Sequence, residues 1–161
     1  MGFPLSYHVG VFEFRGPTAY CEFVEVCKSK LGEKVFVSAA SDSIRHLARQ
    51  YAKLHGCYVV AMLVVEKRML AAAVANMNSF GRVAVCGIIS EYTNASTRAA
   101  PEILSHECDA EFFPKTVEYL LGGKLKTIED VSRGVESIPS AFIGLFNGEN
   151  IGKKIVKVAD E

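Results

Sequence analysis

Apolar and polar positions in the middle of the chain follow two alternating periods. Tyr20, Phe23, Val24 and Cys27 recur at intervals of three and four residues, which indicates an amphipathic helix over residues 18–30. Short and almost continuously apolar runs then alternate with segments of helical period, as expected for strands buried on both faces of a parallel sheet. We predict strands over 34–41, 57–65 and 82–89, and helices over 44–54 and 66–80.

The remaining third of the chain has a looser rhythm. We predict a helix over 109–121, two short helices over 128–138 and 139–146, and a closing strand over 151–158. Residues 1–20 carry several glycines and prolines between aromatic residues, and we expect an irregular leader there. The fold class is therefore α/β, a reduced three-layer sandwich of Rossmann type with a mainly parallel sheet.

The turn between the first predicted strand and its helix reads SAASDSIRHL and contains no glycine. Nucleotide-binding turns of this layout use glycines because a side chain would fill the space of the pyrophosphate. Ser41 and Asp42 are candidate cofactor contacts, but either one also suits the helix N-cap, which is the interpretation we favour. Arg45 either binds a phosphate group or lies solvated on the polar face of the helix.

Composition excludes several classes of function. The 161 residues include 18 basic and 18 acidic side chains, so no overall field favours nucleic acid or an anionic membrane. No apolar run reaches the length of about 18 residues that a membrane span requires. The five cysteines form no CxxC pair, so we expect no metal site; three of them lie in apolar runs, as buried thiols of a cytoplasmic protein do.

Several longer runs carry a specific resemblance. The segments KVFVSAAS, QYAKLHGCYVV, VANMNSFGRVAVCGIISEY and SRGVESIPSAFIGLFNGENIGKKIVKV resemble the plant NADP-dependent alkenal double-bond reductases, which are zinc-independent medium-chain reductases. The resemblance implies reduction of the C=C bond of α,β-unsaturated aldehydes and ketones by NADPH. It also implies that residues 1–33 are a leader and helix joining from a missing N-terminal domain. Residues 34–161 would then form an incomplete dinucleotide-binding-like domain, lacking about fifty residues after the second strand, more than a βαβ crossover.

The resemblance places further candidate residues. Tyr92 aligns with a family tyrosine near the nicotinamide, where a phenol donates a proton; the alternative is an ordinary loop tyrosine. The residues before it lie at the carboxyl end of a parallel strand, where α/β sheets bind ligands. Asn150 aligns with a family asparagine at the nicotinamide end, or is simply a turn residue. The cofactor-binding candidates of this group are Cys86, Gly87, Ile88, Ile89, Ser90 and Asn150.

Three functions stay open at this point. The first is an NADPH-dependent reductase acting on a small enone or alkenal, and the second is a non-catalytic remnant or binding protein of that family. The third is a cofactor-independent enzyme that reuses the pocket with Tyr92 and Glu91. Because the glycines of the turn are missing, we expect binding of NADP to be weak or lost. We also expect a homo-oligomer, with Phe12, Phe14 and Tyr20 among the exposed apolar side chains.

Overall fold

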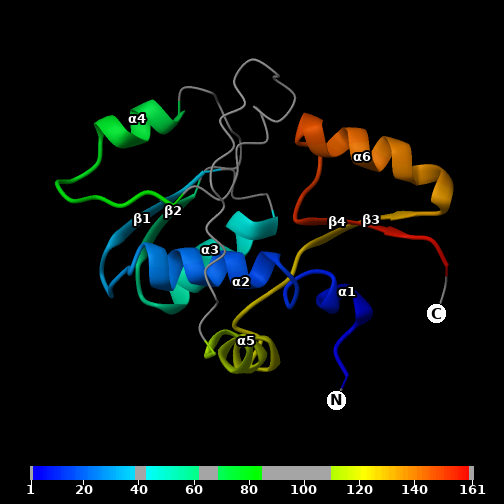
Figure 1. Ribbon diagram of the computed structural model, residues 1–161, viewed down its shortest axis with the longest axis horizontal. Helices are drawn as coiled ribbons and strands as arrows, with labels where there is room; N and C mark the ends of the chain where they lie inside the picture. Colours follow the sequence, from blue (N-terminus) through cyan, green and yellow to red (C-terminus); the bar gives the residue numbers. More distant parts are fainter. Residues whose placement is uncertain (1, 39–42, 62–68, 85–109, 160–161) are drawn as a thin grey trace.

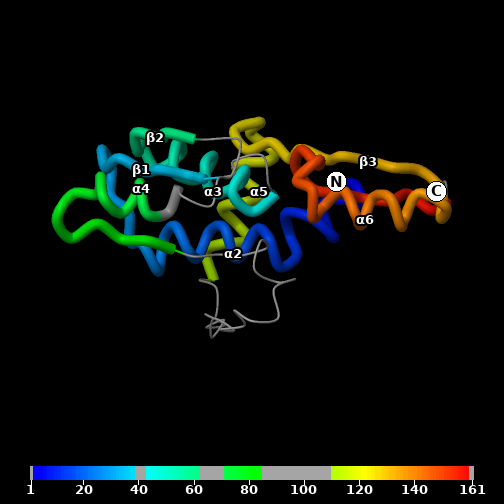
Figure 2. The backbone as a smooth tube through the Cα atoms, turned by 90° about the horizontal axis from the view of Figure 1, so that it is seen from above, coloured from blue at the N-terminus to red at the C-terminus, as the bar shows by residue number. Residues whose placement is uncertain are grey.

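The computed structural model describes residues 2–38, 43–61, 69–84 and 110–159, and within them helices are interleaved with parallel strands (Figure 1). The predicted α/β class is confirmed. Over these residues the strands form two separate two-stranded parallel sheets, β1–β2 and β3–β4, rather than one sheet of four or five strands. Figure 2 shows these sheets toward opposite ends of the molecule, with α3 and α5 between them.

Helical structure begins earlier than the sequence pattern indicates. A single turn, α1 (Leu5–His8), precedes α2 (Arg15–Cys21), which continues into the π-helix η1 (Glu22–Val26). The expectation of an irregular leader is therefore wrong for residues 5–8 and 15–20, whereas residues 9–14 form turns. Pro17 lies in the first turn of α2, where its missing N–H costs no helical hydrogen bond, so a proline there does not signal a loop.

The first sheet is a βαβ unit. β1 (Lys34–Val37) and β2 (Tyr58–Ala61) pair in parallel, with Lys34 opposite Tyr58, and α3 (Ser43–Leu54) connects them. Gly56 ends this helix with a φ of +74°, a conformation that favours glycine, as its position after the last apolar residue predicts. The predicted strand–helix–strand order is confirmed here.

Two further helices match their predictions in type. α4 (Met69–Ala75) lies within the predicted helix over 66–80, and α5 (Phe112–Leu121) within that over 109–121. Pro114 stands in the first turn of α5, and Gly122 follows its end. Of the predicted third strand, residues 82–84 have no strand conformation, and residues 85–89 lie outside the described part.

The second sheet corrects the prediction of a helix over 128–138. β3 (Glu129–Arg133) pairs in parallel with β4 (Lys153–Lys157), with Glu129 opposite Lys153. Between them lie a 3₁₀ turn, η3 (Val135–Ser137), and α6 (Ile138–Asn147). The predicted helix over 139–146 and the predicted closing strand are confirmed.

The core lies where α2, α3 and α5 meet. Tyr20 and Tyr51 are fully buried, and their rings pack edge to face with centroids 5.4 Å apart. Phe112 of α5 packs against Tyr20 with centroids 5.7 Å apart. This cluster joins residues from both sides of the expected boundary at residue 33. Because Tyr20 is at its centre, the expectation that this ring is exposed is wrong.

The described cysteines differ in state. Cys27 and Cys57 are free thiols, and burial raises the pKa of both. Cys21 is disulfide-bonded, so the interpretation of the cysteines as thiols does not extend to this residue. None of the described helices has the length and apolar character that crossing a bilayer would require.

Candidate functional site

The N-terminus of α3 is where a nucleotide-binding βαβ unit receives its phosphate groups. Ser43 is the first residue of this helix and Arg45 lies in its first turn. The other predicted site residues belong to the turn before α3 or to the end of the predicted strand over 82–89 and the residues that follow it. All of them lie outside the described residues. These are Ser41, Asp42, Cys86, Gly87, Ile88, Ile89, Ser90 and Tyr92.

Two predicted residues can be placed. Arg45 is half-buried and does not line the cavity beside the start of α3. Asn150 is also half-buried, and its amide donates to the carbonyl of Gly152 at 2.9 Å. That bond is local and belongs to the loop between α6 and β4, the geometry expected of a turn residue.

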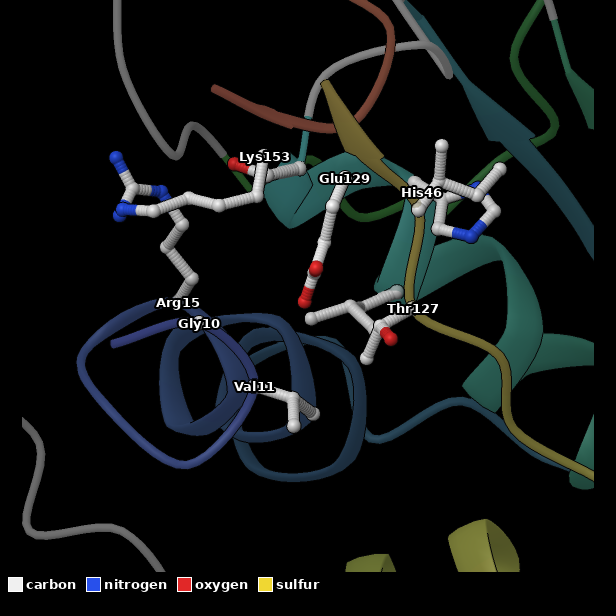
Figure 3. Close-up of a pocket in the computed structure, with 10 residues that line it drawn as sticks. Gly10, Val11, Arg15, His46, Thr127, Glu129 and Lys153 are labelled. Atoms are coloured by element: carbon white, nitrogen blue, oxygen red, sulfur yellow. The ribbon is translucent and has the colours of Figure 1, made fainter. Parts of the chain in front are cut away.

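A small cavity lies beside the first turns of α3. Figure 3 shows it between the segment that carries Gly10, Val11 and Arg15 and the strands that carry Glu129 and Lys153. Its volume is about 20 Å³, room for about one water molecule. Its lining residues come from several segments, among them α2, α3, β3 and β4, so no local sequence pattern could reveal the cavity. Its lining consists of Gly10, Val11, Arg15, Ser43, His46, Leu47, Thr127, Ile128, Glu129 and Lys153.

Two cations define the electrostatics of this cavity. Burial lowers the pKa of Lys153, and repulsion from Arg15 lowers it further, while Glu13 opposes the shift. Neither Arg15 nor Lys153 forms an ion pair with a carboxylate among the described residues. In Figure 3 both side chains extend toward the same side of the cavity, whereas the Glu129 carboxylate points toward the N-terminal segment. The cations therefore favour an anion between them.

The described residues fit part of a dinucleotide. The N-terminus of α3 and the pair Arg15 and Lys153 supply positive charge suited to a pyrophosphate. The volume does not fit, because a space for about one water molecule cannot hold two phosphate groups.

Several known proteins are similar in sequence to this chain. No protein-family model matches it. It is 34% identical to a 2-alkenal reductase (NADP(+)-dependent) from Nicotiana tabacum and 32% identical to a (+)-pulegone reductase from Mentha piperita. In each case the match covers 98% of this chain and 64% of the relative, so the chain spans less than two thirds of their length.

Solved structures show the same fold. The crystal structure of CurA in complex with NADPH from Vibrio vulnificus superposes with a TM-score of 0.82 at 23% identity. That match covers 97% of this chain and 66% of CurA.

The lengths of the alignments bear on the predicted internal deletion. The alignment with the Nicotiana tabacum reductase is 218 residues long, whereas this chain has only 161. The relative therefore contains internal segments that this chain lacks, in agreement with the sequence reading. Over almost its whole length the chain is therefore similar to reductases that include a 2-alkenal reductase (NADP(+)-dependent), of which it spans 64%.

Proposed function

We propose that the chain takes part in NADPH-dependent reduction of the C=C bond of α,β-unsaturated aldehydes or ketones. The observation that carries this proposal is the 34% identity to a 2-alkenal reductase (NADP(+)-dependent) over 98% of the chain. The βαβ unit β1–α3–β2 supports it, because its parallel register brings α3 to the position from which such units bind a dinucleotide.

Bound NADPH would supply the hydride, and the residues of this chain would hold the cofactor and manage the proton. Arg15 and Lys153 would attract the phosphate groups toward the start of α3, because neither is neutralised by a described carboxylate. Tyr92 is the proposed proton donor to the substrate, on the basis of the resemblance alone. The amide of Asn150 is already bonded to Gly152, so its proposed part is to shape the loop before β4.

A second candidate, a non-catalytic binding protein of this family, is favoured by two observations. The cavity at α3 holds about 20 Å³, and the chain spans 64% of its first relatives. A reductase must hold the nicotinamide and the enone with their reacting atoms about 3–3.5 Å apart, and an incomplete cleft loses that orientation.

One pair of measurements separates the two candidates. NADPH is titrated into the purified chain while its fluorescence is followed, and oxidation of NADPH is then recorded with a 2-alkenal and with a cyclic enone. We expect weak NADPH binding, with a Kd above about 10 μM, about −7 kcal/mol. Arg15→Gln and Lys153→Gln should each weaken it further, whereas Lys28→Gln, an exposed change outside the lining of the cavity, should not.

The activity assay gives the decision. Turnover above the enzyme-free control that disappears in Tyr92→Phe supports the reductase, with Tyr92 as its proton donor. Turnover that persists in Tyr92→Phe keeps the reductase and removes Tyr92 from the mechanism. NADPH binding without turnover supports the binding protein, and the absence of both refutes the reductase proposal for this chain.

A further inference from the structure

A second concave surface lies toward the other end of α3, away from Ser43. It is a groove of about 340 Å³ lined by Arg49, Gln50, Lys53, Leu54, Lys124 and Lys126, and we call these six residues the basic groove. None of them lines the cavity beside the start of α3. Its size falls in the range of small-molecule sites, and four of its six side chains are cationic.

The two walls of the basic groove come from distant parts of the sequence. Arg49 and Lys53 are four residues apart in α3 and therefore share one face of the helix. The opposite wall is the segment that follows α5, in which Leu125 is buried at 3% exposure while Lys124 and Lys126 are exposed. Because Leu125 is anchored in the core, the lysines on either side of it are held at the surface beside α3.

Hydrogen bonds lock these walls together. The side-chain amide of Gln50 accepts a bond from Lys126 N at 2.8 Å and donates one to the Lys126 carbonyl at 2.8 Å. His46 Nε2 lies 3.1 Å from the same carbonyl. The backbone positions of the groove are thus fixed before any ligand arrives, which lowers the entropic cost of binding.

The charge of the basic groove is not neutralised. Arg49, Lys53, Lys124 and Lys126 form no ion pair with a carboxylate in the part of the chain that the structure describes. The Nε of Arg49 is buried and has no hydrogen-bond partner there. The whole chain has a formal net charge of zero, so four uncompensated cations around one groove are a local concentration of positive charge.

We propose that the basic groove binds a compact ligand that carries several phosphate groups. Four cationic residues around one groove match clustered phosphate oxygens, because guanidinium and ammonium groups donate charge-assisted hydrogen bonds to them. None of the described residues that line the groove is aromatic, so none of them offers a ring on which a base could stack. Recognition therefore rests on the phosphate cluster itself, whether it belongs to an inorganic oligophosphate or to the triphosphate of a nucleotide.

The test uses the full chain and inorganic tripolyphosphate as the probe, with binding measured by calorimetry. We expect saturable binding that weakens as salt increases, because the contacts are ionic. The double variant Lys124→Gln, Lys126→Gln should raise the Kd about tenfold or more. The control variant Lys28→Gln, Lys34→Gln removes the same charge from exposed positions outside the groove and should leave the Kd within about twofold.

Further arms identify the source of the phosphate cluster and separate this site from the cofactor site. Equal affinity for tripolyphosphate and ATP means that the groove reads phosphate alone, while tighter binding of ATP means that the nucleoside contributes. NADPH at saturation should leave tripolyphosphate binding unchanged. The proposal is overturned if tripolyphosphate does not saturate, if both double variants weaken binding equally, or if NADPH displaces the probe.

Discussion

The hydroxyl of Tyr51 lies 2.9 Å from Oγ1 of Thr116, and both residues are fully buried. This bond joins α3 to α5 across 65 positions of sequence. Burial raises the pKa of Tyr51 to about 12, and the bond to Thr116 opposes that shift. The phenol is therefore neutral and serves the packing of the two helices.

Removing this hydroxyl should destabilise the fold. Tyr51→Phe leaves Thr116 Oγ1 buried without its partner, which should lower the free energy of unfolding by about 1–3 kcal/mol in urea denaturation. Adding Thr116→Val removes the orphaned hydroxyl as well, so the double variant should regain part of that loss. Strictly additive losses would show that the two groups do not interact.

The buried ring of His46 should make stability depend on pH. His46 is 6% exposed; burial lowers its pKa, and the charge of Arg49 lowers it further, while the bond to the Lys126 carbonyl opposes the shift. As the pH falls below about 6.5, His46 binds a proton in the unfolded chain but not yet in the folded chain. The free energy of unfolding should therefore fall by up to about 1.4 kcal/mol per pH unit, until the pH reaches the lowered pKa.

Urea denaturation at a series of pH values measures this effect. His46→Gln removes the titrating group, so its stability should vary less with pH than that of the parent chain. His8→Gln changes an exposed histidine and should keep the parental slope. The same slope in His46→Gln would mean that other groups cause the pH dependence.

Gly152 should be intolerant of a side chain. Its φ is +80°, and a Cβ added there would overlap the carbonyl of Ile128, which accepts a hydrogen bond from Lys153 N at 2.8 Å. Gly152→Ala should therefore cost more than the roughly 1–2 kcal/mol of a left-handed residue alone, because it also displaces β3 from β4.

Gly123→Ala is the matched control for this change. Gly123 has a φ of +64°, and the space around its added Cβ is open. The difference between the two variants in chemical denaturation thus isolates the overlap with Ile128. Equal losses of stability would contradict the role of close backbone approach at Gly152.

The chain should self-associate through α6. Phe142, Ile143 and Phe146 are 60%, 59% and 47% exposed, and the two phenylalanine rings pack edge to face with centroids 5.3 Å apart. Phe14, which we expected to be exposed, is 61% exposed, and Phe12 is half-buried. Contiguous exposed apolar side chains favour association, and a net charge of zero does not oppose it.

Sedimentation over a concentration series tests this assembly. We expect a dimer or a larger species, and Phe142→Glu should shift it toward the monomer. Phe80→Glu is the control, since Phe80 is 98% exposed but lies outside α6. A parent chain that stays monomeric, or equal dissociation by both variants, would count against α6 as the contact.

The spacing of apolar residues and the position of glycines predicted correctly the elements that do not depend on contacts distant in the sequence. The run from β1 through α3 to β2 could be predicted because its apolar periods and Gly56 agree with one another. The segment over 128–138 misled us because Ile128, Val131, Val135 and Ile138 recur at helical spacing. Residues 129–133 form a strand instead, because they pair with β4. The partner residues are 24 positions away in the chain, so local spacing does not reveal this pairing.

The candidate site was predictable only in part for the same reason. The start of α3 follows from the strand–turn–helix pattern, which led to Arg45 and its neighbours. Arg15 and Lys153 are far apart in the sequence and belong to no motif, so only the tertiary fold brings them to one cavity. In the sequence, Lys124 and Lys126 resemble ordinary surface lysines. Only the fold shows that they lie beside α3.

The two hydrogen bonds between the Gln50 side chain and the backbone of Lys126 bear on how α3 and the segment before β3 come apart. The amide proton of Lys126 is held by a side chain of α3 rather than by a strand neighbour, although Lys126 itself is exposed. Its exchange with solvent deuterium therefore requires the bond to Gln50 to break, as happens when α3 separates from the segment that leads into β3. That single amide should act as a natural reporter of whether the two halves of the chain come apart before either of them unfolds.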